Sequence, residues 1–516
     1  MKLAVSSKIS KIDEYSSTSL GISLLELMDR SGAAVERVVR EKVEKGGKVV
    51  VLAGKGNNGG DAYAAAVRLF DSYNIVIYDI FAAGQKTAEG THFRERFISL
   101  GGEVRNYSNN KETTAQIKSS DCIIDAVFGT GFHGEMPENI RPLAIAVRET
   151  VGAYKIAVDV PLGINADDGS VSDFAITVSA TVELSYIKPG IVSYPARSYV
   201  GEIFYDDLGL PMDTLSEMFE FNYNTIDKKW AADNLPRRAE NSNKGTFGKL
   251  LLITGSNKYK GAAYLTAEAA LRGGVGLVTY HGTRELSSAL IEKYPEIIYN
   301  IAKDDDTDFS SVTALSAKHA ATLVGSGSGN TEYVRELTKA LLASDGGVLI
   351  LDADAINALA GLGEEGIALI KASKRKIIIT PHPLEFARLT GQDVATVQEH
   401  RLEQSRKFAK ENKCIVILKG AGTIVTSGNE TYINTSGSSA LAKAGSGDVL
   451  AGLVGALSAM MDKNDLLSAA ALAVYYHGAA GDALSEGFSS YGVTPSDLPC
   501  EIARQIAITE KERNNK

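Results

Sequence analysis

The sequence predicts an α/β protein with at least two domains, each built on a mostly parallel sheet covered by helices. Short apolar runs such as residues 48–53 and 348–352 alternate with longer helical segments along the chain. Most of these runs end in a Gly-bearing polar loop, which is typical of the carboxyl edge of a doubly wound sheet. The chain has 516 residues, too many for a single hydrophobic core.

Composition excludes several functional classes. The net charge of −9 argues against a nucleic-acid surface, which needs a basic stripe. No signal-peptide pattern is present, and no apolar run reaches the roughly 20 residues of a membrane-spanning helix. The three cysteines, Cys122, Cys414 and Cys500, lie far apart without metal-binding spacing and are expected to be buried thiols. We therefore expect a soluble cytoplasmic protein that binds neither nucleic acid nor a membrane.

The first half is predicted to form a Rossmann-like domain over residues 1–215. Residues 1–45 show helical periodicity, and a buried strand at 48–53 leads through a Gly-rich loop to a helix that starts near Ala62. Later strands are expected at 74–79, 121–128 and 154–159. Asp61, Asp125 and Asp159 each adjoin a Gly-bearing loop at a strand's carboxyl end. Each could be only a cap, but three together predict a site.

The loop after the first of these strands also carries Asn57 and Asn58. These side chains offer more acceptors than a phosphate needs, which suits a hard cation or an orienting hydrogen-bond network. A plain tight turn is the alternative interpretation.

Residues 212–238 lose their periodicity, and the domain boundary is placed near 212–228, with a second domain over 225–511. Its strands are expected near 250–254, 321–324, 348–352, 377–380 and 414–419, each ending in a polar loop. His382 stands between two prolines at one such end, which favours a ligand contact. Lys419 precedes flexible amides and could hold nucleotide phosphates.

The segment 442–452 is the most informative in the chain. Gly445, Ser446 and Gly447 leave backbone N–H groups uncovered before a buried helix expected to begin near Asp448. Such amides form an anion site. Asp448 could then take a proton from a hydroxyl while the amides hold the phosphoryl group that this hydroxyl attacks. An N-capping Asp is the alternative. The chain has no Walker A sequence, so it is not expected to be a P-loop enzyme.

The segments 255–263, 351–357, 380–389 and 444–452 together resemble the ADP-dependent NAD(P)H-hydrate dehydratases, a ribokinase-like branch. The resemblance covers about residues 235–510 and implies a ribokinase-like three-layer domain. It implies that Ala262, Gly327, His382 and Asp448 face the hydrated nicotinamide. It also implies ADP as phosphoryl donor and Mg²⁺ supported by Glu385 or by Asp352 and Asp354. The residues expected to hold the nucleotide are Lys419, Gly420, Ala421, Gly422, Thr423, Gly445, Ser446 and Gly447.

The first 210 residues, including 181–190 and 207–211, resemble the YjeF-type NAD(P)H-hydrate epimerases, which implies a Rossmann-like three-layer domain. Asn58 and Asp125 would then ligate K⁺, and Asp159 would contact the substrate. The family's usual Ser in the potassium loop is Leu162 here, so the ion would need backbone oxygens or water, or be absent. The residues expected to bind the hydrated dinucleotide are Asn57, Asn58, Gly59, Gly60, Asp61, Gly129, Thr130, Gly131, Phe132, His133, Gly134 and Glu135.

These resemblances imply repair of hydrated NADH and NADPH (NADHX and NADPHX). The second domain would dehydrate the S form at the expense of ADP, releasing AMP and phosphate. The first would interconvert the R and S forms, with Asp61 and Asp159 handling protons. The alternative is a ribokinase-like small-molecule kinase fused to a non-catalytic Rossmann-like binding or oligomerisation module. A homo-oligomer is the usual expectation for such enzymes.

Overall fold

The computed structural model describes residues 1–81, 86–302 and 308–514. The chain separates into two compact units, Lys2–Tyr223 and Asn224–Lys516, the latter together with Met1. Both units are α/β, as the sequence predicts.

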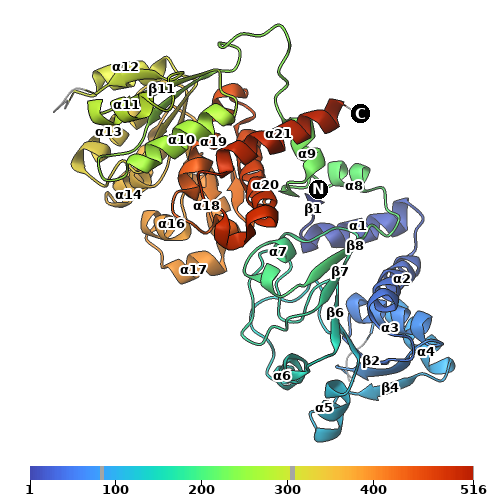
Figure 1. The fold of residues 1–516 in the computed structure, drawn as a ribbon. Coiled ribbons are helices and arrows are strands. Elements are labelled where there is room, and N and C mark those ends of the chain that lie inside the picture. Colours follow the sequence, from blue (N-terminus) through green and yellow to red (C-terminus); the bar gives the residue numbers. More distant parts are fainter. Residues whose placement is uncertain (82–85, 303–307, 515–516) are drawn as a thin grey trace. The chain divides into compact units, whose positions relative to one another are not determined.

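Within the described residues, the first unit contains a seven-stranded parallel sheet in the order β4-β3-β2-β5-β6-β7-β8 (Figure 1). The strands of this unit are β1 (Lys2–Leu3), β2 (Lys48–Ala53), β3 (Asn74–Asp79), β4 (Glu103–Asn106), β5 (Cys122–Ala126), β6 (Tyr154–Val158), β7 (Ala180–Leu184) and β8 (Glu202–Asp206). Its helices are α1 (Ser6–Ser19), α2 (Leu24–Lys42), α3 (Asn57–Leu69), α4 (Ala88–Ser99), α5 (Lys111–Lys118), α6 (Arg141–Glu149), α7 (Pro189–Val192) and α8 (Met212–Met218), with a short 3₁₀ turn at Ala196–Ser198.

Alternate side chains of β2 point to opposite faces of the sheet, which explains the three layers of this unit. Val49 and Val51 belong to a core shared with α2, α3 and α4, whereas Val50 and Leu52 belong to a core shared with α5 and α6. The strands of a sheet that is buried on both faces are continuous apolar runs, which is why these strands could be predicted from the sequence.

The second unit has a mixed sheet in the order β9-β18-β17-β16-β15-β14-β13-β10-β11-β12, parallel from β16 to β12 and antiparallel from β16 to β18. Its strands are β9 (Tyr223–Thr225), β10 (Lys249–Ile253), β11 (Leu277–Gly282), β12 (Ile298–Ile301), β13 (Ala321–Val324), β14 (Val348–Leu351), β15 (Ile377–Ile379), β16 (Ile415–Leu418), β17 (Ile424–Thr426) and β18 (Thr431–Ile433).

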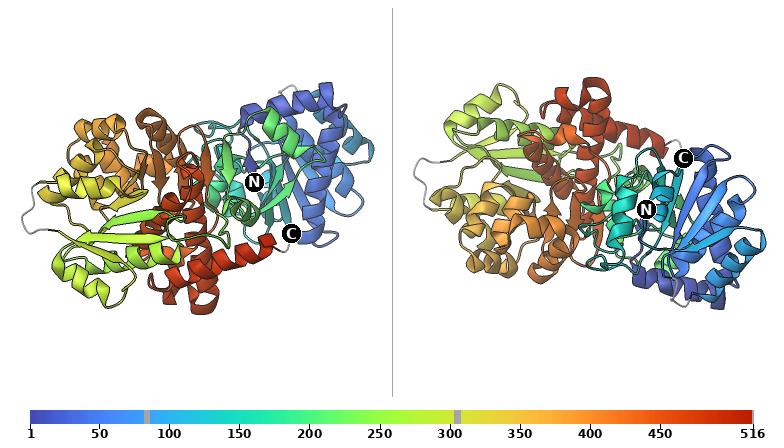
Figure 2. Two further views of the ribbon diagram at one scale, coloured as in Figure 1. Left: turned by 90° about the horizontal axis from the view of Figure 1, so that it is seen from above. Right: turned by 90° about the horizontal axis from the view of Figure 1, so that it is seen from below.

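Helices cover both faces of this sheet (Figure 2). On one side α10, α19, α20 and α21 pack together, and on the other α13 to α18 do. The helices are α9 (Lys228–Asn234), α10 (Lys260–Arg272), α11 (Arg284–Ile291), α12 (Ser310–Ala317), α13 (Glu332–Ala343), α14 (Asp354–Ala360), α15 (Glu364–Ala372), α16 (Pro383–Thr390), α17 (Val394–Glu399), α18 (Arg401–Asn412), α19 (Ser446–Met460), α20 (Leu466–Gly492) and α21 (Leu498–Asn514), with a 3₁₀ turn at Ser439–Leu441.

Close packing of α19 on α10 fixes the height of α19 in the second unit. A Cβ on Gly452 would lie 2.3 Å from the carbonyl oxygen of Thr266, so only glycine fits at this crossing. Ala-rich α10 brings small side chains to the same contact. The N-terminus of α19 is thereby held at the carboxyl edge of the sheet, over strands β10, β13 and β14.

The structure corrects several predictions. The segment 212–238 is not an irregular linker, because it contains α8, β9 and α9. Residues 1–45 are largely helical, as predicted, but they form two helices and are preceded by the short strand β1. Cys122 and Cys414 are buried as expected, but Cys500 is exposed near the start of α21. Among the described residues, no helix has the length and apolarity needed to cross a membrane.

The glycine crossing gives a stability prediction. Gly452→Ala is expected to lower the free energy of unfolding by about 1–3 kcal/mol, because the added methyl meets backbone atoms that cannot move away. The matched control is Gly261→Ala on exposed α10 surface, where the methyl meets no atom within 4 Å. There alanine should stabilise the helix by up to about 1 kcal/mol. Urea unfolding followed by fluorescence of Trp230, the chain's one tryptophan, measures both changes in this unit.

Candidate functional site

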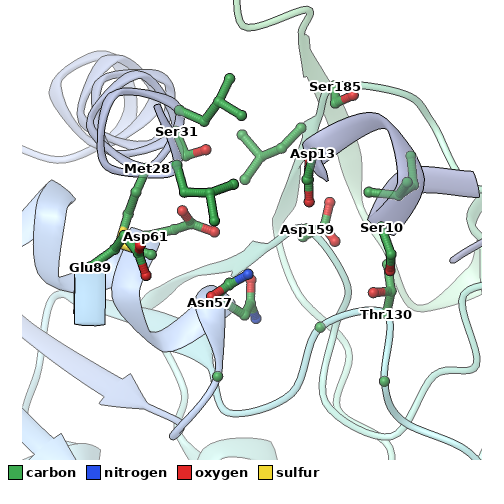
Figure 3. Close-up of a pocket in the computed structure, with 18 of the residues that line it drawn as sticks. Ser10, Asp13, Met28, Ser31, Asn57, Asp61, Glu89, Thr130, Asp159 and Ser185 are labelled. Atoms are coloured by element: carbon green, nitrogen blue, oxygen red, sulfur yellow. The ribbon is translucent and has the colours of Figure 1, made fainter. Parts of the chain in front are cut away.

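The first unit contains a cavity of about 480 Å³ at the carboxyl edge of its sheet (Figure 3). Asp61 and Asp159, two of the predicted carboxylates, line it, and so do Asn57 and Asn58. Asp13 from α1 lines it as well. The structure therefore brings together residues that are far apart in the sequence.

The predicted loop at residues 57–61 is instead the first turn of α3. This helix begins at Asn57 and not near Ala62, with Gly56 as its N-cap. A Cβ on Gly59 would lie 2.2 Å from the carbonyl oxygen of Gly54, so glycine is required for the chain to turn so tightly after β2. The early helix start places Asp61 one turn inside α3, with its carboxylate accepting a hydrogen bond from Ser31.

A buried ammonium group lies beneath these carboxylates. The side chain of Lys188 is fully buried, and its Nζ forms ion pairs with Asp159 and, at 3.4 Å, with Glu183. Asp159 itself has φ of +66°, a left-handed conformation that is uncommon for a residue other than glycine and clusters at functional sites. The ion pair and the unusual backbone together fix the position of the Asp159 carboxylate.

Crowding of carboxylates changes their protonation. Burial, with the nearby Asp159 charge, raises the pKa of Asp13 to about 6. Burial raises the pKa of Asp61 well above its ordinary value, and the charges of Asp159 and Asp13 add to this effect. The cavity thus holds carboxyl groups that are able to keep or exchange a proton near neutral pH.

The two predicted potassium ligands lie next to the same cavity. The Asn58 Nδ2 group donates to the Phe128 carbonyl at 2.9 Å, and Asn58 Oδ1 is buried with no hydrogen-bond partner among the described residues. The buried Asp125 carboxylate accepts from the N–H groups of Val127 and Leu162, the latter at 2.7 Å. The Leu162 side chain is fully buried in an apolar cluster, so it cannot serve as a ligand.

Only part of the predicted substrate-binding segment 129–135 lines the cavity. Gly129, Thr130 and Gly131 line the cavity. Phe132 is buried against Phe128, with ring centroids 5.5 Å apart. The remaining three residues are exposed and do not belong to the cavity wall: His133, Gly134 and Glu135.

In the second unit, α19 begins at Ser446, two residues before the predicted start. Gly445 is its N-cap with φ of +104°, a conformation that favours glycine. Asp448 is therefore inside the first turn and does not cap the helix. The N–H groups of Gly447 and Asp448 make no backbone hydrogen bond among the described residues, and the buried Ser446 Oγ has no partner there either. The Ser446 N–H, which was predicted to be uncovered, instead donates to the Lys443 carbonyl at 3.2 Å, so the candidate anion site is formed by the amides of Gly447 and Asp448.

Acidic neighbours surround Asp448. Burial raises its pKa to about 7, and the charges of Asp352 and Asp354 act in the same direction. The opposing charge is Lys419, whose Nζ lies 3.1 Å from Asp352 and 3.9 Å from Glu385. A carboxyl group with a pKa near neutrality is suited to accept a proton from a substrate.

Lys419 lies beside the helix start, as predicted for a phosphate-binding lysine. A Cβ on Gly447 would be 3.5 Å from its Nζ. The following residues form an exposed loop in which Gly420 and Gly422 have positive φ, and Ala421 and Thr423 belong to the same turn. Buried Arg401 supports this loop from below by donating to the carbonyl of Lys419 at 3.3 Å.

Asp352 and Asp354, which were predicted to support Mg²⁺, differ in how many hydrogen bonds they already accept. Asp352 is buried and already accepts from Ser326 and Thr380, at 2.7 and 2.6 Å, as well as from Lys419. Asp354 accepts one hydrogen bond, from the N–H of Gly329, and burial raises its pKa. Among the described residues no three His, Cys, Asp or Glu side chains are grouped for a metal ion.

His382 has a local structural role that the sequence did not indicate. Its Nδ1 accepts from the N–H groups of Leu384 and Glu385, and Glu385 in turn accepts from the His382 N–H. This capping box starts α16. Burial and the charge of Lys419 lower the pKa of His382, so the imidazole is neutral.

Gly327 and Ala262, the last two residues predicted to contact the substrate, lie against each other. Gly327 has φ of +62°, and a Cβ there would be 2.5 Å from the Cβ of Ala262. Ala262 lies in the first turn of α10, which begins at Lys260. The glycine loop after β13 and the start of α10 are thus in direct contact.

Sequence reasoning missed Asp13, Lys188 and His477. Asp13 lies in the helical residues 1–45, to which no site was assigned. Lys188 lies in the segment 181–190, which resembles the epimerases but in which no residue was given a separate role. His477 from α20 is buried and hydrogen-bonded through Nε2 to the Ser446 carbonyl at 3.0 Å. Burial lowers its pKa to about 4, so it stays neutral behind the anion site. Only the tertiary fold brings these three residues to the sites.

Comparisons with known proteins match each of the two units to a family model. One family model, described as YjeF-related protein N-terminus, matches residues 24–190, and another, described as NAD(P)H-hydrate dehydratase, matches residues 250–504. A bifunctional NAD(P)H-hydrate repair enzyme of Moorella thermoacetica is 31% identical, over 96% of this chain and 95% of that protein. An enzyme of the same description from Escherichia coli (strain K12) is 32% identical, over 96% of this chain and 92% of that protein.

The chain belongs to the bifunctional NAD(P)H-hydrate repair enzymes. It combines an epimerase domain with a dehydratase domain in one polypeptide. Among solved structures, an ADP/ATP-dependent NAD(P)H-hydrate dehydratase from Bacillus subtilis, co-crystallized with ATP/Mg²⁺, is 27% identical. That similarity covers 56% of this chain and 99% of the other, with a TM-score of 0.48.

The capping role of His382 gives a prediction that separates structure from binding. His382→Ala should lower the free energy of unfolding by about 1 kcal/mol, because two helix N–H groups lose their acceptor. His382→Asn should unfold like the wild type, since asparagine is a good N-cap. Urea unfolding compares the two variants. An Asn variant as unstable as the Ala variant would contradict the capping role.

Proposed function

We propose that dehydration takes place at the N-terminus of α19, with Asp448 as the proton acceptor. The observation that carries this proposal is a carboxyl group of raised pKa in the same helix turn as unbonded amide donors. An acceptor for a hydroxyl proton and donors for a phosphoryl group are the two requirements of phosphoryl transfer to an alcohol.

The first chemical step is transfer of the β-phosphoryl group of ADP to the C6 hydroxyl of S-NAD(P)HX. Asp448 takes the hydroxyl proton, the oxygen forms a bond to the β-phosphorus, and the bond to the bridging oxygen breaks to release AMP. The amides of Gly447 and Asp448 stabilise the charge on the transferring group. Lys419, beside Gly447, neutralises phosphate charge.

The second step is elimination. The C6–O bond breaks and phosphate leaves, while the proton on C5 passes to water and the C5–H electron pair restores the C5=C6 double bond of NAD(P)H. Phosphate is a far better leaving group than hydroxide, which explains the consumption of a nucleotide. In this proposal Ala262, Gly327 and His382 border the nicotinamide, and the loop 420–423 borders the adenine nucleotide.

Mg²⁺ fits this site through Asp354 and the nucleotide's own phosphates. Asp352 is fully engaged by Lys419 and two hydroxyl groups, so it is better placed to hold the ammonium than the ion. When bound, Mg²⁺ would supply positive charge to the phosphate oxygens.

The first unit is proposed to interconvert R- and S-NAD(P)HX in the cavity lined by Asp61 and Asp159. Asp61 is the candidate for proton transfer. Asp159 is paired with Lys188 and is best suited to contact and orient the substrate. K⁺ fits beside Asn58, because Asn58 Oδ1 is a buried acceptor with no donor among the described residues. The Asp125 carboxylate, which accepts from the N–H of the cavity-lining Val127, is the second candidate ligand. Backbone oxygens or water would complete its shell in place of the Leu162 side chain.

The family matches favour this repair function over a small-molecule kinase joined to a non-catalytic module. A cytoplasmic location and a homo-oligomeric state, both expected from the sequence, remain part of this proposal.

The dehydratase proposal is tested with S-NADHX, ADP and Mg²⁺. Asp448→Asn should reduce the return of NADH absorbance by about 10²–10⁴-fold, the usual range for a general base. The wild-type rate should fall as the pH drops through about 7, since Asp448 must be ionised to accept a proton. Asp482→Asn is the control, because this partly buried carboxylate on α20 accepts a hydrogen bond from the Gly437 N–H and has no role in the proposal. Full turnover by Asp448→Asn would remove Asp448 as the acceptor.

The epimerase proposal is tested with the full chain and an R and S mixture of NADHX. The wild type should return all of the hydrate to NADH, because the R form is converted and then dehydrated. Asp61→Asn should return the S portion at the normal rate and the R portion only at the spontaneous rate. Complete clearance by this variant would exclude Asp61 from the reaction.

A further inference from the structure

Asp13 is an acidic residue of the epimerase cavity to which no role has been given above. It lies on α1, before the residues 24–190 that match the family model. Figure 3 shows Asp13 next to Asp159, with Asp61 on the opposite side of the cavity and turned toward them. α1 thus adds a third carboxyl group to the two supplied by the sheet edge and α3.

The three carboxyl groups differ in their partners. Asp159 is engaged by the ammonium of Lys188, and Asp61 accepts a hydrogen bond from Ser31. Among the ion pairs and hydrogen bonds of the described residues, none engages the Asp13 side chain. Asp13 is therefore available to a ligand in the cavity, and its charge is balanced by no partner of its own.

Inversion at C6 makes a demand that one carboxyl group cannot meet. C6 carries the hydroxyl and is bonded to ring nitrogen N1, so loss of the hydroxyl leaves a planar cation stabilised by the nitrogen lone pair. A donor must protonate the hydroxyl as it leaves one face, and an acceptor must take a proton from the water that adds to the other face. Two groups on opposite sides of the ring are needed.

We propose that Asp13 is the second acid–base residue of the epimerase site, acting across the ring from Asp61. This inference rests on the proposed function of the first unit. In one direction Asp61 protonates the C6 hydroxyl, the C6–O bond breaks, water leaves and N1=C6 forms. A water molecule then adds to the opposite face of C6, its oxygen forms the new bond, and its proton passes to Asp13. In the reverse direction the two residues exchange roles.

The electrostatics suit a pair that holds one proton. Burial raises the pKa of Asp61 well above its ordinary value, which favours its protonated form, whereas Asp13, with a pKa of about 6, is mostly ionised at neutral pH. The charged groups that face Asp13 are Asp159, Asp61 and Lys188, and Glu183 lies behind the lysine. Asp159 raises the pKa of Asp13, and Lys188 opposes this effect.

The test is Asp13→Asn in the full chain, with inversion of R-NADHX followed through the coupled return of NADH. We expect inversion to fall by about 10²-fold or more, the effect of losing a general acid–base group. Dehydration of S-NADHX should be unchanged. Glu14→Gln, on the exposed side of the same helix, is the matched control and should invert at the wild-type rate.

Two further measurements separate catalysis from packing. Wild-type inversion should decline as the pH falls below about 6, because a doubly protonated pair has no acceptor, and Asp13→Asn should lack this decline. Formate should restore part of the inversion in Asp13→Ala by entering the vacated space as a carboxylate.

The outcomes are distinct. Inversion by Asp13→Asn close to the wild-type rate, with Asp61→Asn inactive, would overturn the role of Asp13 and leave the epimerase proposal standing. Lost inversion that formate does not restore would assign Asp13 to packing and also overturn it. Absence of inversion in the wild type would instead refute the proposed function of the first unit.

Discussion

Each unit of this protein depends on one buried ammonium group that holds several carboxylates together. Lys188 pairs with Asp159 and Glu183 in the first unit, and Lys419 pairs with Asp352 and approaches Glu385 in the second. Without these cations the carboxylates could not remain charged away from water. At both sites the acids outnumber these cations, and burial, with the charges of neighbouring carboxylates, raises the pKa values of Asp13, Asp61 and Asp448. That surplus supplies the proposed proton carriers.

The scaffold explains why these charges meet at a sheet edge. Parallel strands buried on both faces can carry polar groups only where they end, and the following loops turn tightly through glycines. Gly59 and Gly327 allow backbone approaches that a Cβ would prevent. The close contact of α10 with α19 then holds the amides at the start of α19, the proposed anion site, over the same edge. Packing and chemistry thus share the same few small residues.

The strands and the α/β class could be predicted because buried strands form continuous apolar runs. The starts of α3 and α19 were predicted too late in the sequence, because Gly-rich segments are typical of loops and only the tertiary structure shows that these are helical. Asp61, Asp159 and Asp448 were predicted from their positions after strands or glycines, and the structure places each at a candidate site. Asp13 could not be found in this way, because its helix reaches the cavity only through the three-dimensional fold. Nor could the capping role of His382, which depends on the local geometry of α16.

The hydrogen bonds that hold the Asp125 carboxylate determine which substitutions its surroundings can accept. Its two hydrogen bonds come from the peptide N–H groups of Val127 and Leu162 and from no side chain. A residue's identity can change without altering its peptide group, provided that the backbone path is kept. Leucine at position 162 therefore still donates its backbone N–H to the Asp125 carboxylate. Substitutions at positions 127 and 162 would remove this support only if it depended on their side chains.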